Sequence, residues 1–283
     1  MKIAAVVILY NPTDEVVKNI HSYLGAIDKL YIIDNSTEPA SKIRTSFPGK
    51  ENVVYLHDGE NKGIASRLNQ VIKMAKNDGY DWLLTMDQDS LFPDEMFTNY
   101  LNCVIKFEKK EKVSMFGINH SEKITTGDFC NAVLVKHLIT SGSILNLKAE
   151  SAIGEFDENL FIDEVDFEYC LRSILHGFQI IQFTNMFLAH NLGETVNRRS
   201  FKTTKLSSRV LHSPQRLYYM TRNLLYVEAK YKSRFPAEIK ERRKMLLNRI
   251  KNNVLYQKQR FTVLKFFIKG FSDYRKKRMG KLK

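Results

Sequence analysis

Apolar and polar positions follow a regular order along the first third of the chain. Short apolar runs, each the length of one strand, are separated by longer stretches with helical spacing. The strand-like runs cover 3–9, 30–33, 53–56 and 82–86, and the clearest helical stretch covers 62–77. This alternation predicts an α/β fold with a mostly parallel, Rossmann-like central sheet flanked by helices.

The second half of the chain changes character twice. Residues 112–192 mix short strands with one amphipathic helix, and a helical pattern follows. Pro214 suits a first helical turn, and Pro236 separates that helix from a basic tail. We therefore expect an α/β domain over residues 1–230 and a basic, amphipathic helical C-terminal region over 231–283.

The net charge of +13 is concentrated at one end of the chain. Residues 230–283 carry 19 Lys/Arg against 3 Asp/Glu, whereas residues 1–229 carry 25 against 28. A basic tail on a nearly neutral body argues against nucleic-acid binding, which requires basic residues across a face of the body. Apolar residues are interleaved with the basic ones in the tail, as in segments that lie on anionic membranes. We expect the tail to dock on an anionic membrane surface; packing on the body is the alternative.

The cysteines and the lengths of the apolar runs indicate the cellular compartment in which the protein is located. Cys103, Cys130 and Cys170 are odd in number and form no C-x-x-C pair, so we expect three free thiols, as in a reducing cytoplasm. The apolar run at the N-terminus is too short to span a bilayer, and no stretch of about 18 uncharged apolar residues follows it. These features predict a cytoplasmic protein, peripheral at the inner face of the cell membrane.

Two carboxylates with one residue between them end the fourth strand, in Asp87-Gln88-Asp89. Ligands of parallel sheets bind beyond the carboxyl ends of the strands. Paired carboxylate oxygens in a turn suit a hard divalent cation, Mg²⁺ or Mn²⁺, which would neutralise a diphosphate. A solvated acidic turn is the plainer alternative.

Polar residues after two other strands suit a nucleotide. Asp34 ends the second strand, where its carboxylate could accept a hydrogen bond from a pyrimidine N–H or close an Asx turn. Asn61 and Gly63 open the helix after the third strand, and Arg67 lies one turn inside it. Backbone N–H groups and a cation at a helix start predict a phosphate or ribose contact, although an N-cap and a surface arginine give the same pattern.

A second acidic cluster and a histidine add further chemistry. Asp163, Glu164 and Asp166 lie at the expected start of a helix, where ionised carboxylates are favoured. A carboxylate there could accept the proton of an attacking hydroxyl, although dipole matching alone explains such a cluster. His190 follows an apolar run and could offer its imidazole to a metal or be an ordinary core histidine.

The order of these motifs resembles that of a known enzyme family. The chain has no G-x-G-x-x-G or Walker-type loop and no Ser-His-Asp arrangement, which argues against dehydrogenases, kinases and covalent hydrolases. It resembles the inverting family 2 glycosyltransferases of the GT-A fold, and among them most of all the bacterial rhamnosyltransferases. The resembling segments are VVILYNP (6–12), IIDNS (32–36), NKGIASRLNQ (61–70), LLTMDQDS (83–90), TSGSILN (140–146), FIDEVDFEYCLR (161–172), AHNLG (189–193) and HSPQRLYYMTRN (212–223).

The resemblance implies roles for the strand-end residues. Asp34 would contact the nucleotide base. Asp87 and Asp89 would hold the donor diphosphate through Mg²⁺ or Mn²⁺, with His190 as a further metal ligand.

The resemblance also implies a general base. Asp166 matches the second acid of the family's Asp-Asp-x-Glu pattern, and we expect it to activate the acceptor hydroxyl. Val165 stands where the pattern has its first acid, so Asp163 and Glu164 remain alternative bases.

Enzymes of the resembled type use dTDP-β-L-rhamnose and build O-antigen, capsule or similar surface polysaccharide. We therefore expect a dTDP-rhamnose donor and a glycan or lipid-linked acceptor. Galactofuranosyltransferases share nearly the same motif order, so a UDP-sugar donor is an alternative. A protein that binds a nucleotide sugar without catalysis is a further alternative.

Overall fold

The computed structural model describes the chain except for residues 121–127, 129, 191–194 and 200–205, and only the backbone of 190, 195–199 and 206–210. The chain forms two compact units. Unit 1 comprises Met1–Phe161 and Val165–Asn191, and unit 2 comprises Ile162–Glu164 and Leu192–Lys283. The boundary expected at residue 230 falls inside unit 2.

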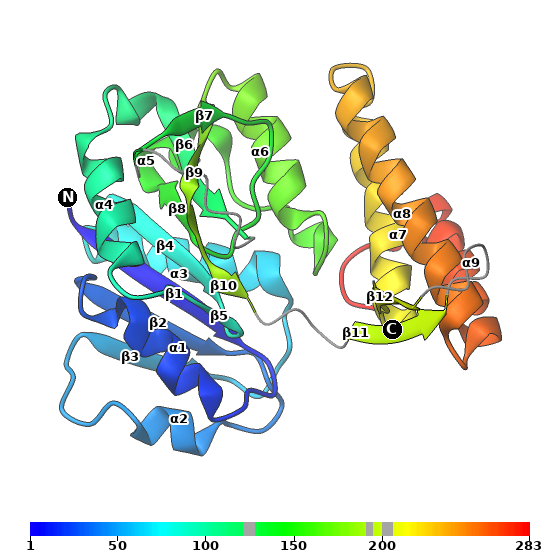
Figure 1. Ribbon diagram of the computed structural model, residues 1–283, viewed down its shortest axis with the longest axis horizontal. Helices are drawn as coiled ribbons and strands as arrows, with labels where there is room; N and C mark the ends of the chain where they lie inside the picture. Colours follow the sequence, from blue (N-terminus) through cyan, green and yellow to red (C-terminus); the bar gives the residue numbers. More distant parts are fainter. Residues whose placement is uncertain (121–127, 129, 191–194, 200–205) are drawn as a thin grey trace. The chain divides into compact units, whose positions relative to one another are not determined.

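An eight-stranded sheet forms the middle of unit 1 (Figure 1). Its strands, in spatial order, are β3 (Val53–His57), β2 (Lys29–Asp34), β1 (Ile3–Leu9), β4 (Trp82–Asp87), β8 (Ser143–Asn146), β6 (Val113–Asn119), β9 (Gln179–Phe187) and β7 (Ala132–Leu134). The strands β1 to β4 are mutually parallel and β9 is parallel to β6, whereas β8 and β7 are antiparallel to their neighbours. The expected mostly parallel sheet is confirmed.

Helices cover both faces of this sheet. They are α1 (Glu15–Leu24), α2 (Ser41–Thr45), α3 (Ile64–Asn77), α4 (Met96–Lys106), α5 (Leu147–Ile153) and α6 (Val165–Leu175), with short 3₁₀ turns η1 (Lys110–Lys112) and η2 (Glu158–Leu160). Along β1, Ile3, Ala5 and Val7 join one apolar cluster with residues of α1 and α4, while Ala4 and Val6 are buried on the opposite face. Strands that are buried on both faces read as continuous apolar runs, which is why the sequence pattern located them.

The described part of unit 2 contains an antiparallel hairpin and three helices. The hairpin pairs β11 (Thr195–Arg199) with β12 (Leu206–Val210), and the helices are α7 (Pro214–Tyr231), α8 (Pro236–Tyr256) and α9 (Arg260–Arg275). Ser213 caps α7 by accepting from Arg216 N at 3.2 Å, and Pro214 occupies the first turn as expected. The helical C-terminal region is thus confirmed, and none of the helices described has an apolar stretch that could cross a membrane.

The structure corrects the expectation of three free thiols. Cys103 on α4 and Cys130 form a disulfide across 27 residues, with 5.2 Å between their Cα atoms, and only Cys170 is a free, buried thiol. The two cysteines meet because α4 packs against β9, and β7, which closely follows Cys130, pairs with β9. Neither C-x-x-C spacing nor the odd number of cysteines could reveal a pair that the sheet topology brings together.

Candidate active site

Three parallel strands end at one edge of the sheet and bring two of the predicted carboxylates near each other. In the strand register Asp34 pairs with Leu9, and Asp87 pairs with Ile8. Neighbouring strands are about 4.8 Å apart, so the backbones of Asp34 and Asp87 lie about 10 Å apart on either side of β1. This edge, at the carboxyl ends of β1, β2 and β4, is where parallel sheets bind ligands.

The Asp87-Gln88-Asp89 turn is anchored through its middle residue. The Gln88 side chain accepts from Tyr10 N at 2.7 Å and donates to Tyr10 O at 3.2 Å, while its backbone carbonyl accepts from Asn19 Nδ2. Asp87 N donates to Ser141 Oγ at 3.2 Å. Asp87 is exposed and Asp89 is partly buried. The turn therefore presents its two carboxylates from a backbone that Tyr10, Asn19 and Ser141 hold in place.

The backbone of His190 lies next to this turn. A two-stranded ribbon pairs β10 (Ala189–His190) with β5 (Ser90–Leu91), and His190 pairs with Ser90. The His190 side chain is outside the described part of the structure, so its role as a metal ligand stays a prediction. Among the side chains that are described, no group of three His, Cys, Asp or Glu residues is arranged to hold a metal.

Asp34 is enclosed by its own loop. Its side chain is 0% exposed, and its oxygens accept hydrogen bonds from Ser36 N, Ala40 N and the Tyr55 hydroxyl. Burial raises the pKa of this carboxyl, but the hydrogen bonds outweigh burial and hold its pKa below the ordinary value. With no exposed oxygen, Asp34 shapes the loop after β2 in this structure, and the predicted base contact would require that loop to open.

The backbone N–H groups at the start of α3 already donate hydrogen bonds within the protein, unlike those of a helix terminus that is open to a phosphate. Lys62 N donates to Asn35 Oδ1, Gly63 N to Asn61 Oδ1, and Ile64 N to Phe161 O at 2.6 Å. All three N–H groups already have protein acceptors in this structure, and the phosphate or ribose contact expected here stays a prediction. Gly63 has φ +82°, and a Cβ there would meet Phe161 O at 2.5 Å, so this close approach requires glycine.

Arg67 lies inside the protein rather than on its surface. It is 2% exposed, and its guanidinium donates to Asp58, to Glu60 O and to Asn35 Oδ1. The hydrogen bond with Arg67 is the main reason that the pKa of Asp58 lies far below its ordinary value. Arg67 thus fixes the loop between β3 and α3. The helical pattern alone gave no sign of this role, since Asp58 and Asn35 come from other segments.

The acidic segment before α6 is not helical, contrary to the sequence expectation. Helix α6 begins at Val165, while Asp163 and Glu164 have φ of 63° and 64°, in the left-handed region that non-glycine residues rarely adopt. Both belong to unit 2 by their contacts. Asp163 pairs with Arg216 of α7 at 3.3 Å, and Glu164 pairs with Arg242 of α8 at 3.0 Å.

A buried asparagine holds this acidic segment in its unusual conformation. Asn223 Nδ2 donates to Ile162 O at 2.7 Å and to Asp163 O at 3.0 Å. Asn223 Oδ1 in turn accepts from Nε of the fully buried Arg222 at 3.0 Å. The Arg-Asn pair at the end of the HSPQRLYYMTRN motif is therefore a scaffold for the acidic segment.

Asp166 and Glu168 lie in the first turns of α6 and differ in their partners. Glu168 is 0% exposed and pairs with Arg172 at 2.9 Å. Asp166 is partly buried, and its Oδ1 accepts from Phe167 N at 2.8 Å. Among the described residues, Asp166 forms no ion pair, unlike Asp163, Glu164 and Glu168.

Topology places the start of α6 at the same sheet edge as the Asp87-Gln88-Asp89 turn. Strand β10 extends the carboxyl end of β9 beside Ser90. Helix α6 leads into β9 through a short turn, so α6 begins near the edge at which β9 ends. The contact of Phe161 O with Ile64 N ties the chain just before the acidic segment to that edge. The backbones of Asp34, Asp87, His190 and Asp166 therefore gather at one edge of the sheet in unit 1.

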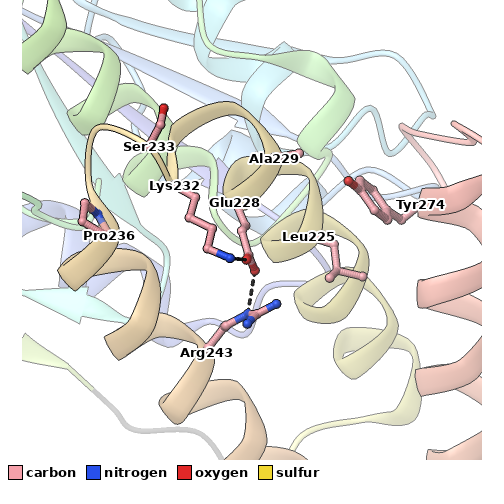
Figure 2. A pocket seen from close by; sticks show the side chains of 8 residues that line it. All are labelled: Leu225, Glu228, Ala229, Lys232, Ser233, Pro236, Arg243 and Tyr274. Atoms are coloured by element: carbon pink, nitrogen blue, oxygen red, sulfur yellow. Dashed lines mark ion pairs between the residues drawn. The ribbon is translucent and has the colours of Figure 1, made fainter.

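A pocket in unit 2 involves none of the predicted site residues. It is lined by residues of α7 and α8, the turn between them, and Tyr274 (Figure 2). Figure 2 shows the Glu228 carboxylate between Lys232 and Arg243, at 3.5 Å and 2.6 Å. Glu228 pairs with both cations, and the lining of this pocket includes none of the strand-end residues predicted for the transferase site.

Comparisons with known proteins agree with this architecture. Residues 4–122 match the model of glycosyl transferase family 2. The chain is 26% identical over 245 residues to the dTDP-rhamnosyl transferase RfbF of Shigella flexneri, covering 78% of each chain.

Solved structures share the fold. S. aureus TarS 1-349 in complex with UDP-GlcNAc has a TM-score of 0.62 at 16% identity, over 97% of this chain and 80% of that one. A longer S. aureus TarS structure has a TM-score of 0.59 at 16% identity, and the present chain spans 49% of its length. Together these results show that residues 4–122 match glycosyl transferase family 2 and that the chain is a glycosyltransferase with the GT-A fold.

Proposed function

We propose that the protein is an inverting rhamnosyltransferase that moves L-rhamnose from dTDP-β-L-rhamnose to a glycan or lipid-linked acceptor of surface-polysaccharide synthesis such as O-antigen. The similarity to a dTDP-rhamnosyl transferase supports the donor. The observation that carries the mechanism is that Asp166, alone among the acids of 163–168, forms no ion pair with the described residues.

In this mechanism Asp166 is the general base. The acceptor hydroxyl oxygen attacks the anomeric carbon and forms the new glycosidic bond, while its proton passes to the Asp166 carboxylate. The bond between the anomeric carbon and the diphosphate oxygen breaks, and dTDP leaves with its electron pair. A carboxylate that an arginine already neutralises is a weaker base, which favours Asp166 over Asp163 and Glu164.

The Asp87-Gln88-Asp89 turn fits a divalent cation. Asp87 is exposed, Asp89 shares its turn, and the His190 backbone lies opposite Ser90. Hard cations prefer carboxylate oxygens, so Asp87 and Asp89, with the His190 imidazole, would hold Mg²⁺ or Mn²⁺. A bound cation would offset the charge on the departing diphosphate. Asn61, Gly63 and Arg67 would shape the nucleotide site through the loop that they order.

We also propose that the acceptor is reached at the inner face of the cell membrane through the C-terminal region. Phe261, Leu264, Ile268 and Phe271 lie on one face of α9 and are exposed, Phe261 at 82% and Ile268 at 63%. Basic residues surround this face in a region with 19 Lys/Arg and 3 Asp/Glu. Such a surface suits anionic lipid headgroups.

A panel of nucleotide sugars tests the donor. Full-length protein is incubated with dTDP-rhamnose, UDP-galactofuranose and UDP-N-acetylglucosamine, with Mn²⁺ or with EDTA, and release of the nucleoside diphosphate is measured. We expect turnover with dTDP-rhamnose that depends on the metal. Turnover with only a UDP-sugar would favour the alternative donor, which the TarS complex with UDP-GlcNAc makes the second candidate. Binding without turnover of any sugar would favour a non-catalytic binder.

A further inference from the structure

The acidic segment of unit 2 lies among arginines of two helices. Arg216 of α7 pairs with Asp163, and Arg242 of α8 pairs with Glu164 through both Nε at 3.1 Å and Nη2 at 3.0 Å. These two arginines and two carboxylates balance in charge. A third arginine, Arg249, lies two helical turns after Arg242 on the same face of α8.

Arg249 forms no ion pair with a carboxylate among the described residues. It is partly buried, and among the described residues its guanidinium has a single hydrogen-bond partner, the thioether Sδ of Met220 at 3.8 Å. Burial lowers the pKa of Arg249, and the charges of Arg242 and Arg216 lower it further, although Asp163 and Glu164 act in the opposite direction. A thioether is a weak acceptor. Among the described residues, the cluster of Arg216, Arg242 and Arg249 with Asp163 and Glu164 therefore holds one guanidinium more than it has carboxylates.

The backbone around Arg249 is rigidly built. Asn253, which is 0% exposed, accepts from His212 N at 2.9 Å and donates to Arg249 O at 2.8 Å. Gln257, the residue after α8, donates to His212 O, so Asn253 and Gln257 together fix the chain just before α7. The His212 ring is close enough to Arg249 and Arg216 for their charges to lower its pKa. Arg249 is thus presented in a fixed place beside a second arginine and an imidazole.

We propose that Arg249, together with Arg216 and His212, binds a phosphoryl oxyanion of the acceptor substrate. A guanidinium offers a planar pair of N–H donors that match two oxygens of one phosphate group. A partly buried cation that no carboxylate contacts directly is costly, and a bound oxyanion reduces that cost. Arg216 is half exposed and holds Asp163 at the outer limit of hydrogen bonding, so its remaining donors can turn to the same ligand. That the oxyanion belongs to the acceptor rests on the proposed transferase function.

Binding of inorganic pyrophosphate and phosphate tests the site itself. Titration calorimetry is performed on the full chain in EDTA, so that metal-dependent binding of a diphosphate at the donor site does not contribute. We expect Arg249→Gln to weaken pyrophosphate binding at least tenfold. Lys251→Gln is the matched control, because Lys251 is exposed on the same helix and its one hydrogen bond among the described residues is to Asn248 Oδ1. Equal binding by wild type and Arg249→Gln, or an equal loss in Lys251→Gln, would overturn the proposal.

A second variant, Arg249→Lys, keeps the proposal testable if Arg249→Gln does not fold. Arg249→Lys keeps the charge but lacks the planar fork, and we expect it to bind pyrophosphate more weakly than wild type and more tightly than Arg249→Gln. If Arg249→Gln does not fold, Arg249→Lys decides: full wild-type affinity in that variant would contradict a site built on the guanidinium fork.

Two further measurements distinguish the sources of the oxyanion. Transfer is compared for a sugar linked to an alkyl diphosphate and the same sugar as its methyl glycoside. A rise in KM of Arg249→Gln for the diphosphate acceptor alone, with kcat nearly unchanged, supports an acceptor site. Weaker binding to phosphatidylglycerol vesicles with unchanged KM shows instead that the site reads a lipid headgroup, and it overturns the acceptor assignment. Because pyrophosphate binding needs no turnover, a failure of the transferase proposal would leave that result intact.

Discussion

At the scale of single residues, carboxylates in this protein differ mainly in whether a cation already neutralises them. Asp58 is paired with Arg67, and Glu168 with Arg172, so both are structural. Asp166 forms no ion pair with any described residue. A general base must be free to take up a proton, so the partners of each acid rank the candidates more sharply than their positions in the sequence do.

Substitution of Asp166 should separate binding from chemistry. We expect Asp166→Asn to lose transfer by about 10²–10⁴-fold, the usual contribution of a general base, with donor affinity unchanged. Steady-state kinetics and a donor-binding titration measure the two quantities.

The matched variant is Asp163→Asn, which removes a carboxylate that Arg216 already neutralises. We expect it to change transfer much less. Full activity of Asp166→Asn would contradict the assignment and leave Asp163 or Glu164 as the general base.

His212 should make stability depend on pH. Burial is the main reason that its pKa falls from 6.5 to about 4, followed by the charges of Arg249 and Arg216. Between these two pH values the His212 imidazole is protonated in the unfolded chain but stays neutral in the folded protein. The stabilising contribution is therefore full above pH 6.5 and declines as the pH falls toward 4.

Because the ring is only partly buried, we expect a loss of about 1 kcal/mol in the free energy of unfolding between pH 7 and pH 5 from this group. Urea unfolding of the wild type and of His212→Gln at both values isolates the effect. The same decline in both proteins would show that His212 contributes nothing.

At the scale of elements, α9 has two faces with different partners. Its Val263 and Gly270 are buried in unit 2, and a Cβ on Gly270 would meet Tyr218 O at 2.8 Å. The opposite face exposes Phe261 and Ile268. One face of α9 is buried in unit 2, and the other is the face that we propose contacts a membrane.

Polar substitutions on the exposed face of α9 should therefore affect membrane binding and leave folding intact. We expect Phe261→Ser combined with Ile268→Ser to reduce co-sedimentation with phosphatidylglycerol vesicles about tenfold, because apolar area that enters the bilayer is lost. Leu247→Ser on α8 is the control, since Leu247 is 63% exposed and lies outside that face. Unchanged sedimentation of the double variant would refute docking through α9.

The sequence predicted the secondary-structure elements well where a strand is buried on both of its faces. The run that became β1 was located to the residue, because both faces of that strand are covered and every position is apolar. The start of α6 was placed too early, since the conformation of Asp163 and Glu164 depends on Asn223 and Arg242, far along the chain. Local propensity carries no record of such contacts.

The candidate site was predictable to a similar degree. Polar residues after strand ends pointed to the edge at which parallel sheets bind ligands, because parallel strands share one direction. The sequence could not reveal that Arg67 and Asp34 face inward, since their partners, Asp58 and Tyr55, come from other segments. Hydrophobic periodicity shows which side of a helix is apolar. It does not show which polar side chains find their hydrogen-bond partners within the protein.

At the scale of the whole molecule, the Cys103–Cys130 disulfide should make stability sensitive to reductants. The bond closes a loop across 27 residues, and a disulfide of this kind typically contributes about 2–4 kcal/mol, largely by restricting the unfolded chain. We expect dithiothreitol to lower the thermal midpoint of the wild type. The double variant Cys103→Ser/Cys130→Ser should start lower and show no response.

Cys170→Ala provides the control, because Cys170 is a free buried thiol and its loss leaves the reductant response in place. If dithiothreitol leaves the wild-type midpoint unchanged, the two thiols are unpaired in solution, as the sequence first suggested.

The segment 162–164 also constrains how this enzyme can be re-engineered. Both of its flanks in the chain belong to unit 1, yet its contacts are made with Asn223, Arg216 and Arg242 of unit 2. A chimera that exchanged the C-terminal helices with those of a relative would leave two left-handed residues without support, at about 1–3 kcal/mol each. To exchange substrate specificity between such enzymes, residues 162–164 should therefore be transferred together with α7 and α8, which contact them.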